Sequence, residues 1–218
     1  MNLLSVNKIK ALPADGYVII DIRPSAFFVN GFIPNSIHLP YTENFIENAG
    51  LLLEPENKLI LITEPGMETT IAKTLHNTGF ATVAGIVEGG YEAWQVNEAN
   101  KDIIIDIDAE EFELDFNYDE FYLIDVRPEE EYAQEHFEYA ENLPLSEIEE
   151  AIPDLSLDLT YYIYGNTFED AALAASLFKR SGFNKLRVVN QGYEALKATN
   201  IPVVKKKKTK TDNNFSNN

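Results

Sequence analysis

The stretch Val18-Ile19-Ile20-Asp21-Ile22-Arg23-Pro24 occurs a second time in the chain, as Tyr122-Leu123-Ile124-Asp125-Val126-Arg127-Pro128. Both copies are short apolar runs, as expected of buried parallel strands, and both end in Asp-x-Arg-Pro. A further block also recurs in the same order, because Gly90-Tyr91-Glu92-Ala93-Trp94 returns as Gly192-Tyr193-Glu194-Ala195-Leu196. The offset is nearly constant and far longer than a solenoid repeat, so the sequence predicts a duplicated domain.

The 218 residues are enough for two small domains with cores of their own. We predict a first domain at residues 1–100 and a second at residues 101–204, with the boundary near Asn97–Lys101. Residues 205–218 start with four lysines and have no apolar periodicity. We expect this segment to be a disordered basic tail.

Each copy alternates apolar runs with amphipathic stretches. Strands are predicted at residues 18–22, 58–63 and 82–87, and again at residues 122–126, 161–164 and 186–189. Helices are predicted over Thr69–Thr78 and Glu169–Ser181, and the spacing of acidic residues after Asp108 predicts a helix start there. The predicted fold class is α/β, with two domains that each hold a mainly parallel five-stranded sheet and helices on both faces.

Composition excludes several classes of function. The net charge is −19, which argues against nucleic acid or an anionic membrane as a partner. There is no apolar run of membrane-spanning length and no signal peptide, so we expect a cytoplasmic protein. The chain has no cysteine, which excludes disulfides, thiolate metal sites and a cysteine nucleophile. No metal and no cofactor are predicted.

Both copies resemble rhodanese homology domains. That family follows its Asp-x-Arg strand end with a Gly-His-Ile-Pro-Gly-like stretch, then a cysteine-bearing loop before a helix, then Gly-Gly-Tyr-x-Ala-Trp. Copy one has Gly31-Phe32-Ile33-Pro34-Asn35-Ser36 and Gly89–Trp94 at these places, and copy two has Glu135–Ala140 and Gln191–Leu196. The tandem is also similar to the rhodanese pair fused to metallo-β-lactamase-fold hydrolases in some bacteria. The hydrolase part and its histidine-rich metal motif do not occur here.

The resemblance implies sulfur transfer through a thiolate held by converging backbone N–H groups at the start of a helix. The position of that cysteine falls on Thr63 in copy one and on Gly165 in copy two. Glycine offers no side chain, and a threonine hydroxyl is a nucleophile only beside a base. The resemblance therefore implies that both copies have lost the family's activity.

Both loops at this position carry acids and no Lys or Arg. Loop 1 reads Thr63, Glu64, Pro65, Gly66, Met67, Glu68, and loop 2 reads Gly165, Asn166, Thr167, Phe168, Glu169, Asp170. Carboxylates there repel an anionic sulfur donor, and they stabilise a helix start. We expect Glu68 or Thr69 to cap the first helix, and Thr167 or Asp170 to cap the second. The pairs Asp21 with Arg23 and Asp125 with Arg127 are interpreted as structural.

Three functions remain open. The first is a catalytically inactive, acidic pseudoenzyme that acts as a binding or regulatory module for a protein partner, such as a sulfur-handling enzyme or metallo-hydrolase. The second is a sulfurtransferase-type protein that holds a sulfur donor for a partner's thiol. The third is binding of a cation or neutral small molecule in the emptied loops. The resemblance to a sulfur-transferring family suggests the partner class, although fold alone does not imply function.

Overall fold

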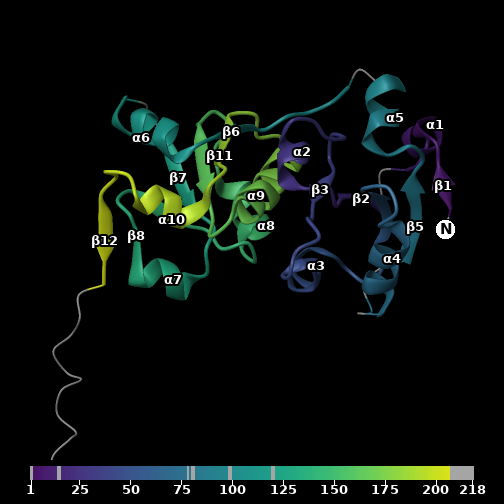
Figure 1. Ribbon diagram of the computed structural model, residues 1–218, viewed down its shortest axis with the longest axis horizontal. Coiled ribbons are helices and arrows are strands. Elements are labelled where there is room, and N and C mark those ends of the chain that lie inside the picture. Colours follow the sequence, from purple (N-terminus) through teal and green to yellow (C-terminus); the bar gives the residue numbers. More distant parts are fainter. Residues whose placement is uncertain are drawn as a thin grey trace, which may run out of the picture.

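Apolar runs from the first half of the chain pair as one parallel sheet, and those of the second half pair as another (Figure 1). The computed structural model describes residues 2–13, 16–77, 79, 82–97, 100–118 and 121–206. The first sheet has the order β1-β5-β4-β2-β3. Its strands are β1 (Leu3–Leu4), β2 (Tyr17–Asp21), β3 (Ile37–His38), β4 (Lys58–Ile62) and β5 (Thr82–Val87).

The second sheet has the equivalent order, β6-β11-β10-β7-β9, and all its pairings are parallel. Its strands are β6 (Ile105–Ile107), β7 (Tyr122–Asp125), β9 (Ala140–Asn142), β10 (Tyr161–Tyr164) and β11 (Leu186–Val189). The predicted fold class of two α/β domains with five-stranded parallel sheets is thus confirmed. The domain bounds at residues 100 and 204 stay a prediction, and residues 98–99 within the expected junction lie outside the described residues.

Helices connect the strands of each sheet. The first half contains α1 (Val6–Lys10), α2 (Ser25–Val29), α3 (Phe45–Leu52), α4 (Glu68–Asn77) and α5 (Gly90–Asn97). The second contains α6 (Ala109–Tyr118), α7 (Glu129–Gln134), α8 (Ile148–Ala151), the 3-10 turn η1 (Ile152–Asp154), α9 (Phe168–Arg180) and α10 (Gly192–Lys197). Glu111 N–H donates to the Asp108 carboxylate at 2.8 Å, so Asp108 starts α6 as predicted.

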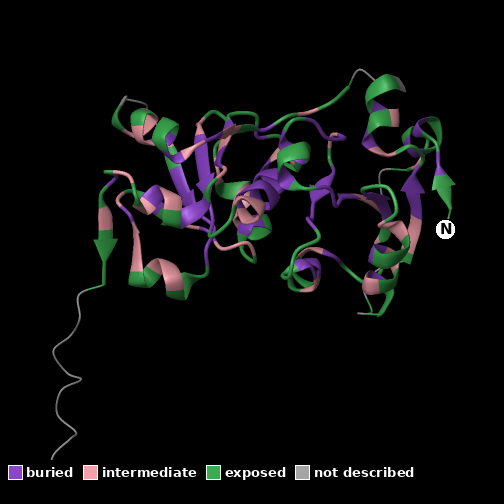
Figure 2. Cartoon of the chain, viewed as in Figure 1, coloured by how far each residue is buried: buried purple, intermediate pink, exposed green. Residues whose placement is uncertain are grey.

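Most residues in the central strands of the two sheets are buried (Figure 2). Successive side chains along a strand belong to different apolar clusters, one on each face of the sheet. In β4, Leu59 and Leu61 enter one cluster while Ile60 and Ile62 enter another. A single apolar cluster contains residues of both halves, among them Leu61 of β4 and Ile163 of β10. The two domains therefore share one continuous core.

Helix α9 of the second half forms the centre of this shared core, against α2 and β3 of the first half (Figures 1 and 2). Strand β3 is an edge strand, so its outer backbone groups lack a partner strand. Ser176 of α9 supplies the missing partner, because its Oγ accepts a hydrogen bond from His38 N–H at 3.0 Å. The same hydroxyl donates to the Leu173 carbonyl at 2.7 Å.

The segment that joins the two halves forms backbone hydrogen bonds with the first domain before the chain enters the second sheet. Phe32 and Asp102 form an antiparallel bridge, and Ile104 N–H donates to the Val29 carbonyl at 3.0 Å. At the other end, β12 (Val203–Lys205) pairs antiparallel with β8 (Glu135–Phe137). This strand includes Lys205, the first residue of the segment predicted to be disordered, and residues 207–218 lie outside the described residues.

Candidate functional site: two degenerate loops at the domain interface

The Asp-x-Arg motif of the first domain forms a buried ion pair. Asp21 ends β2, and its two carboxylate oxygens accept from Arg23 Nε at 2.9 Å and from Arg23 Nη2 at 2.6 Å. Nη2 also donates to the Gly31 carbonyl at 2.9 Å, and the guanidinium lies 4.2 Å from the centre of the Tyr91 ring. The three motifs of copy one are therefore joined at one point.

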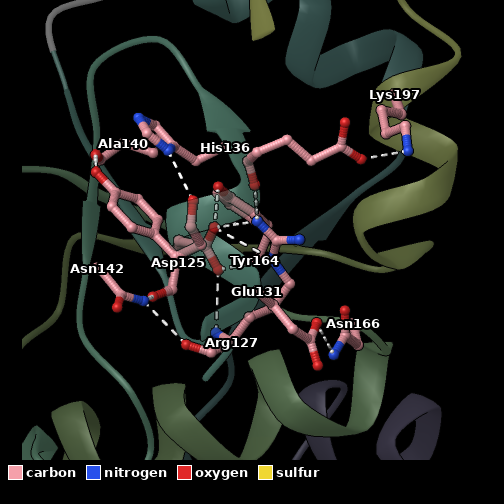
Figure 3. Close-up of polar contacts among 11 residues, drawn as sticks. Asp125, Arg127, Glu131, His136, Ala140, Asn142, Tyr164, Asn166 and Lys197 are labelled. Atoms are coloured by element: carbon pink, nitrogen blue, oxygen red, sulfur yellow. Dashed lines mark hydrogen bonds and ion pairs between the residues drawn. The ribbon is translucent and has the colours of Figure 1, made fainter. Parts of the chain in front are cut away.

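The second domain repeats this arrangement (Figure 3). Arg127 Nε and Nη2 donate to the Asp125 carboxylate at 3.0 and 2.7 Å, and Nη2 also donates to the Glu135 carbonyl at 2.9 Å. The guanidinium lies 3.5 Å from the centre of the Tyr193 ring. Here the carboxylate has one more partner, the Tyr164 hydroxyl, which donates to it at 2.6 Å. Burial raises the pKa of that hydroxyl, so it stays a donor.

Loop 2 leaves β10 at Gly165 and enters α9 through a complete capping box. Thr167 Oγ1 accepts from Asp170 N–H at 3.2 Å, while the Asp170 carboxylate accepts from Thr167 N–H at 3.0 Å and from its hydroxyl at 2.8 Å. The expected cap by Thr167 and Asp170 is thus present. Burial raises the pKa of Asp170, and the hydrogen bonds from Thr167 partly offset that effect.

The same Asp170 side chain occupies the space beside Gly165. A Cβ built on Gly165 would lie 2.6 Å from Asp170 Cβ and 3.2 Å from Val126 Cγ2. Gly192 of the Gly-Tyr-Glu-Ala motif approaches loop 2 from the other side, with a φ of +73° and no room for a Cβ beside the Asn166 carbonyl. Loop 2 is therefore packed too closely to hold a larger residue at position 165 without movement.

Loop 1 is built differently. Thr63 follows β4 and is 7% exposed, and Gly66 makes the turn with a φ of +90°. No described residue is a hydrogen-bond partner of the Thr63 hydroxyl, so no base lies in place to activate it. We expected Glu68 or Thr69 to cap α4. Among the described residues, neither side chain forms a hydrogen bond with the first turn of this helix. Helix α4 starts instead from a turn in which Met67 N–H donates to the Glu64 carbonyl.

Each loop borders a cavity that the opposite domain helps to line. The cavity at loop 1 is about 270 Å³ and is lined by Glu64 and Met67 together with Glu169 of the second domain. The cavity at loop 2 is about 420 Å³ and lies between Asn166, Asp170 and helix α3 of the first domain. We refer to the second cavity as the α3 cleft.

The α3 cleft contains residues that the sequence did not single out. Helix α3 contributes Glu47 and Asn48, and Asn44 immediately precedes it. Helix α7 contributes Glu131, whose carboxylate accepts from Asn166 Nδ2 at 2.8 Å (Figure 3). The spacing of Asn44 and Asn48, one helical turn apart, is the only signal in the sequence for this group. This spacing does not indicate that the two asparagines face loop 2 of the other domain.

Within the described ranges, no group of His, Asp and Glu side chains is arranged to hold a metal ion. No helix in this part of the chain combines the length and apolarity needed to cross a bilayer. Of the acids in the two loops, Asp170 caps α9, while Glu64 and Glu169 line one cavity and Asp170 lines the other.

The fold and the paired loops define a tandem of two rhodanese-like units. The family model described as Rhodanese-like domain matches residues 5–97 and again residues 108–199, so the chain belongs to the rhodanese-like domain family. No curated protein matches the chain significantly.

Several solved structures are similar. The Alr3790 protein from Anabaena is 25% identical over 45% of this chain and 91% of its own, with a TM-score of 0.43. A rhodanese with anions from E. coli is 30% identical over 40% of this chain and 100% of its own, with a TM-score of 0.35. Thiosulfate sulfurtransferase from Pseudomonas aeruginosa is 15% identical over 94% of this chain but 44% of its own length, with a TM-score of 0.42.

Proposed function

We propose that the chain is a catalytically inactive tandem rhodanese-like protein that acts as a binding or regulatory module. One observation carries this proposal: neither loop holds a thiol at the position where the family's nucleophile stands, since Thr63 and Gly165 occupy those positions and the chain has no cysteine. A persulfide needs a thiolate to carry it, and no other side chain can do so.

The charges around the loops support the same conclusion. Arg127 is the one cation among the described residues that line the two cavities, and Asp125 already neutralises it. Acids line both cavities, so an anionic donor such as thiosulfate meets repulsion at each. This favours loss of activity over a protein that holds a donor for a partner's thiol.

In this proposal, the pairs Asp21–Arg23 and Asp125–Arg127 have structural roles. In each guanidinium, Nε and Nη2 donate to the carboxylate, Nη2 also donates to a backbone carbonyl, and an aromatic ring covers one face, so the group is already committed to contacts within its own domain. The partner is a protein, and the family suggests a sulfur-handling enzyme or a metallo-hydrolase.

A sulfur-transfer assay tests the proposal. With thiosulfate or 3-mercaptopyruvate as donor and cyanide as acceptor, we expect thiocyanate formation no faster than the uncatalysed background. The same assay with an added low-molecular-weight thiol covers the donor-holding alternative, and we expect no acceleration there. Turnover of about 1 per second or faster, which is ordinary for an enzyme, in either assay would overturn the proposal.

A further inference from the structure

Tyr139 has a backbone conformation that favours other residue types. It lies in the turn between β8 and β9 with a φ of +67°, in the left-handed region that suits glycine and, less well, asparagine. The equivalent position of the first domain, 104 residues earlier, is Asn35 with a φ of +68°. The two turns therefore share this conformation, and the second domain forms its turn with a large aromatic residue, for which a positive φ is a genuine outlier.

Contacts on both sides of Tyr139 fix this turn. Glu138 N–H donates to the Pro202 carbonyl at 2.8 Å, and the Tyr132 hydroxyl donates to the Ala140 carbonyl at 2.7 Å. Neither bond uses the Tyr139 side chain, which is 76% exposed, so burial of the ring does little to offset the strain. Strained residues that the surrounding structure holds in place occur where the side chain serves a function.

Tyr139 is the outer member of a row of aromatic rings. Its ring centre lies 6.4 Å from that of Phe116 in α6, which lies 5.9 Å from that of Phe121. The Phe121 ring lies 4.6 Å from that of the buried Tyr162 and packs, like Phe116, against the core of the second domain. We call Phe116, Phe121 and Tyr139 the aromatic corner. An exposed aromatic ring that rests on partly buried ones is typical of the anchor points of protein interfaces.

The side chains around the aromatic corner are acidic. Glu138 and Glu141 lie on either side of Tyr139 in the chain, and neither carboxylate has an ion pair or hydrogen bond with a described residue. Arg187 lies on the same side of the domain, but Asp115 of α6 pairs with it at 2.9 Å. The charge that faces an incoming molecule here is therefore negative.

The charge of the whole molecule decides between possible occupants. Residues 101–204 carry 24 acidic and 7 basic side chains, and the chain has a net charge of −19. A second copy, a nucleic acid or an anionic membrane is therefore repelled from the aromatic corner. The lysine run of this chain starts at Lys205, which pairs with Glu135 at the end of β8 away from Tyr139. The surface fits a segment of another protein in which basic residues flank an apolar one.

We propose that the aromatic corner is the surface that binds the protein partner. An apolar side chain of the partner packs on Tyr139 and Phe116, and lysines or arginines on either side of it pair with Glu138 and Glu141. The inference rests on the proposed function, which makes the chain a binding module for a protein, and it specifies where that protein binds and what chemistry it presents.

Substitution of Tyr139 separates binding from stability. Tyr139→Gly removes both the ring and the backbone strain, and Tyr139→Asn introduces the residue that the first domain has at this position. We expect the melting temperature of each variant to equal that of the unaltered protein or to exceed it by up to about 4 °C. A fall of about 2 °C or more would show that the ring stabilises the fold, and it would overturn the inference.

NMR titration of the full chain with an end-blocked peptide, in which two lysines stand on each side of a central leucine, measures binding. We expect saturable amide shifts at residues 138–141 and in α6. The same peptide with a central glycine should bind about tenfold more weakly, since it lacks the apolar anchor. Tyr139→Gly should weaken binding of the leucine peptide by ~10-fold, whereas Tyr139→Phe keeps the ring and should stay within about twofold.

The charge contribution has its own matched control. Glu138→Gln combined with Glu141→Gln should weaken the leucine peptide by about fivefold, while Glu54→Gln combined with Glu56→Gln, exposed in the first domain, should stay within about twofold. Equal binding of the two peptides, shifts spread evenly over the acidic surface, or self-association that Tyr139→Gly abolishes would each refute the inference. Thiocyanate production from thiosulfate would instead refute the proposed function, whatever the peptides do.

Discussion

Thr63 and Gly165 follow equivalent strands, but the space around them differs. Thr63 already has a branched side chain in a buried position, whereas the Asp170 side chain fills the space beside Gly165. The two loops have therefore departed from the family pattern in different ways. Loop 1 retains room for a side chain, and loop 2 uses that room for its own helix cap.

Restoring a cysteine should test this difference. Gly165→Cys should lower the melting temperature, because its Cβ would lie 2.6 Å from Asp170 Cβ, and it should give no thiocyanate from thiosulfate. Glu169 and Asp170 would also raise the thiol pKa and repel the donor, so basic residues at those positions should be needed for activity. Thr63→Cys is the matched control and should keep the melting temperature near that of the unaltered protein. A stable persulfide on Gly165→Cys with fast cyanide turnover would contradict the electrostatic argument.

His38 is a buried histidine whose imidazole is held in its neutral form. Its ring donates from Nδ1 to the Asp21 carbonyl at 3.2 Å and accepts at Nε2 from the Ser25 hydroxyl at 2.8 Å, which fixes the neutral form. Burial lowers the pKa of His38 to about 3 from its usual 6.5, and the charge of Arg23 acts in the same direction.

Stability should consequently fall on acidification. Between pH 6.5 and about 3 the unfolded chain gains a proton at His38 that the folded protein does not take up, so this residue lowers the free energy of unfolding by up to about 1.4 kcal/mol per pH unit. Urea unfolding at pH 7, 6 and 5.5 measures the slope above the range in which most carboxyls titrate. His38→Gln should flatten the slope, and the exposed His76→Gln should not. Equal slopes for all three proteins would show that folding does not lower the pKa of His38.

At the scale of elements, helices α4 and α9 occupy the same place in the two domains but start differently. Helix α9 has the reciprocal box of Thr167 and Asp170, whereas the described hydrogen bonds give α4 no side-chain cap from Glu68 or Thr69. A capping residue contributes about 0.5–2 kcal/mol to stability. The two helix starts should thus respond differently to the same substitution.

Replacement of the threonine at each start measures that contribution. Thr167→Ala should lower the free energy of unfolding by about 1 kcal/mol, or the melting temperature by about 2–4 °C for a chain of this size. Thr167→Ser keeps the acceptor and should restore most of the loss. Thr69→Ala, in the uncapped helix, should change stability by less than about 0.5 kcal/mol. If both alanine variants lost the same stability, the box would contribute nothing beyond helix propensity.

Element boundaries could be read closely from the sequence because the apolar runs are short and are followed by glycine, asparagine or a charged residue. The strands Thr82–Val87, Tyr161–Tyr164 and Leu186–Val189 have the bounds predicted for them, and α9 is displaced by one residue from its predicted range. The short helices α3 and α8 carried no such signal, because they are too brief for a clear 3.6-residue period.

At the scale of the whole molecule, the apolar residues of both domains form one cluster around α9. The bond from His38 N–H to Ser176 Oγ links the second half to the first. Lys179 of α9 also forms an ion pair at 2.7 Å with Asp102 of the junction, which itself bridges to Phe32 of the first half. Domains that share a core should unfold as one unit, because opening the interface exposes apolar surface on both sides.

Ser176→Ala tests this coupling. It removes the acceptor for the buried His38 N–H and should cost about 1–3 kcal/mol. Trp94 is the single tryptophan and lies in the first domain, so its fluorescence reports that domain alone, while far-UV circular dichroism reports both. We expect both transitions to shift together, although the substitution is in the second domain. Ser181→Ala, at the exposed end of α9, is the control, and separate transitions in Ser176→Ala would argue against one cooperative unit.

The sequence by itself determined the duplication, the α/β class, the positions of the main strands along the chain and the lack of a thiol at Thr63 and Gly165, because these depend on local patterns and residue chemistry. It also indicated Thr167 and Asp170 as a cap, since a capping box spans only four residues. Only the tertiary structure decided that Asp170 fills the space beside Gly165, that α3 of the first domain closes loop 2, and that Asn48 faces the resulting cleft. These relations join residues far apart in the chain through packing between domains, and no pattern within either half encodes which surfaces meet.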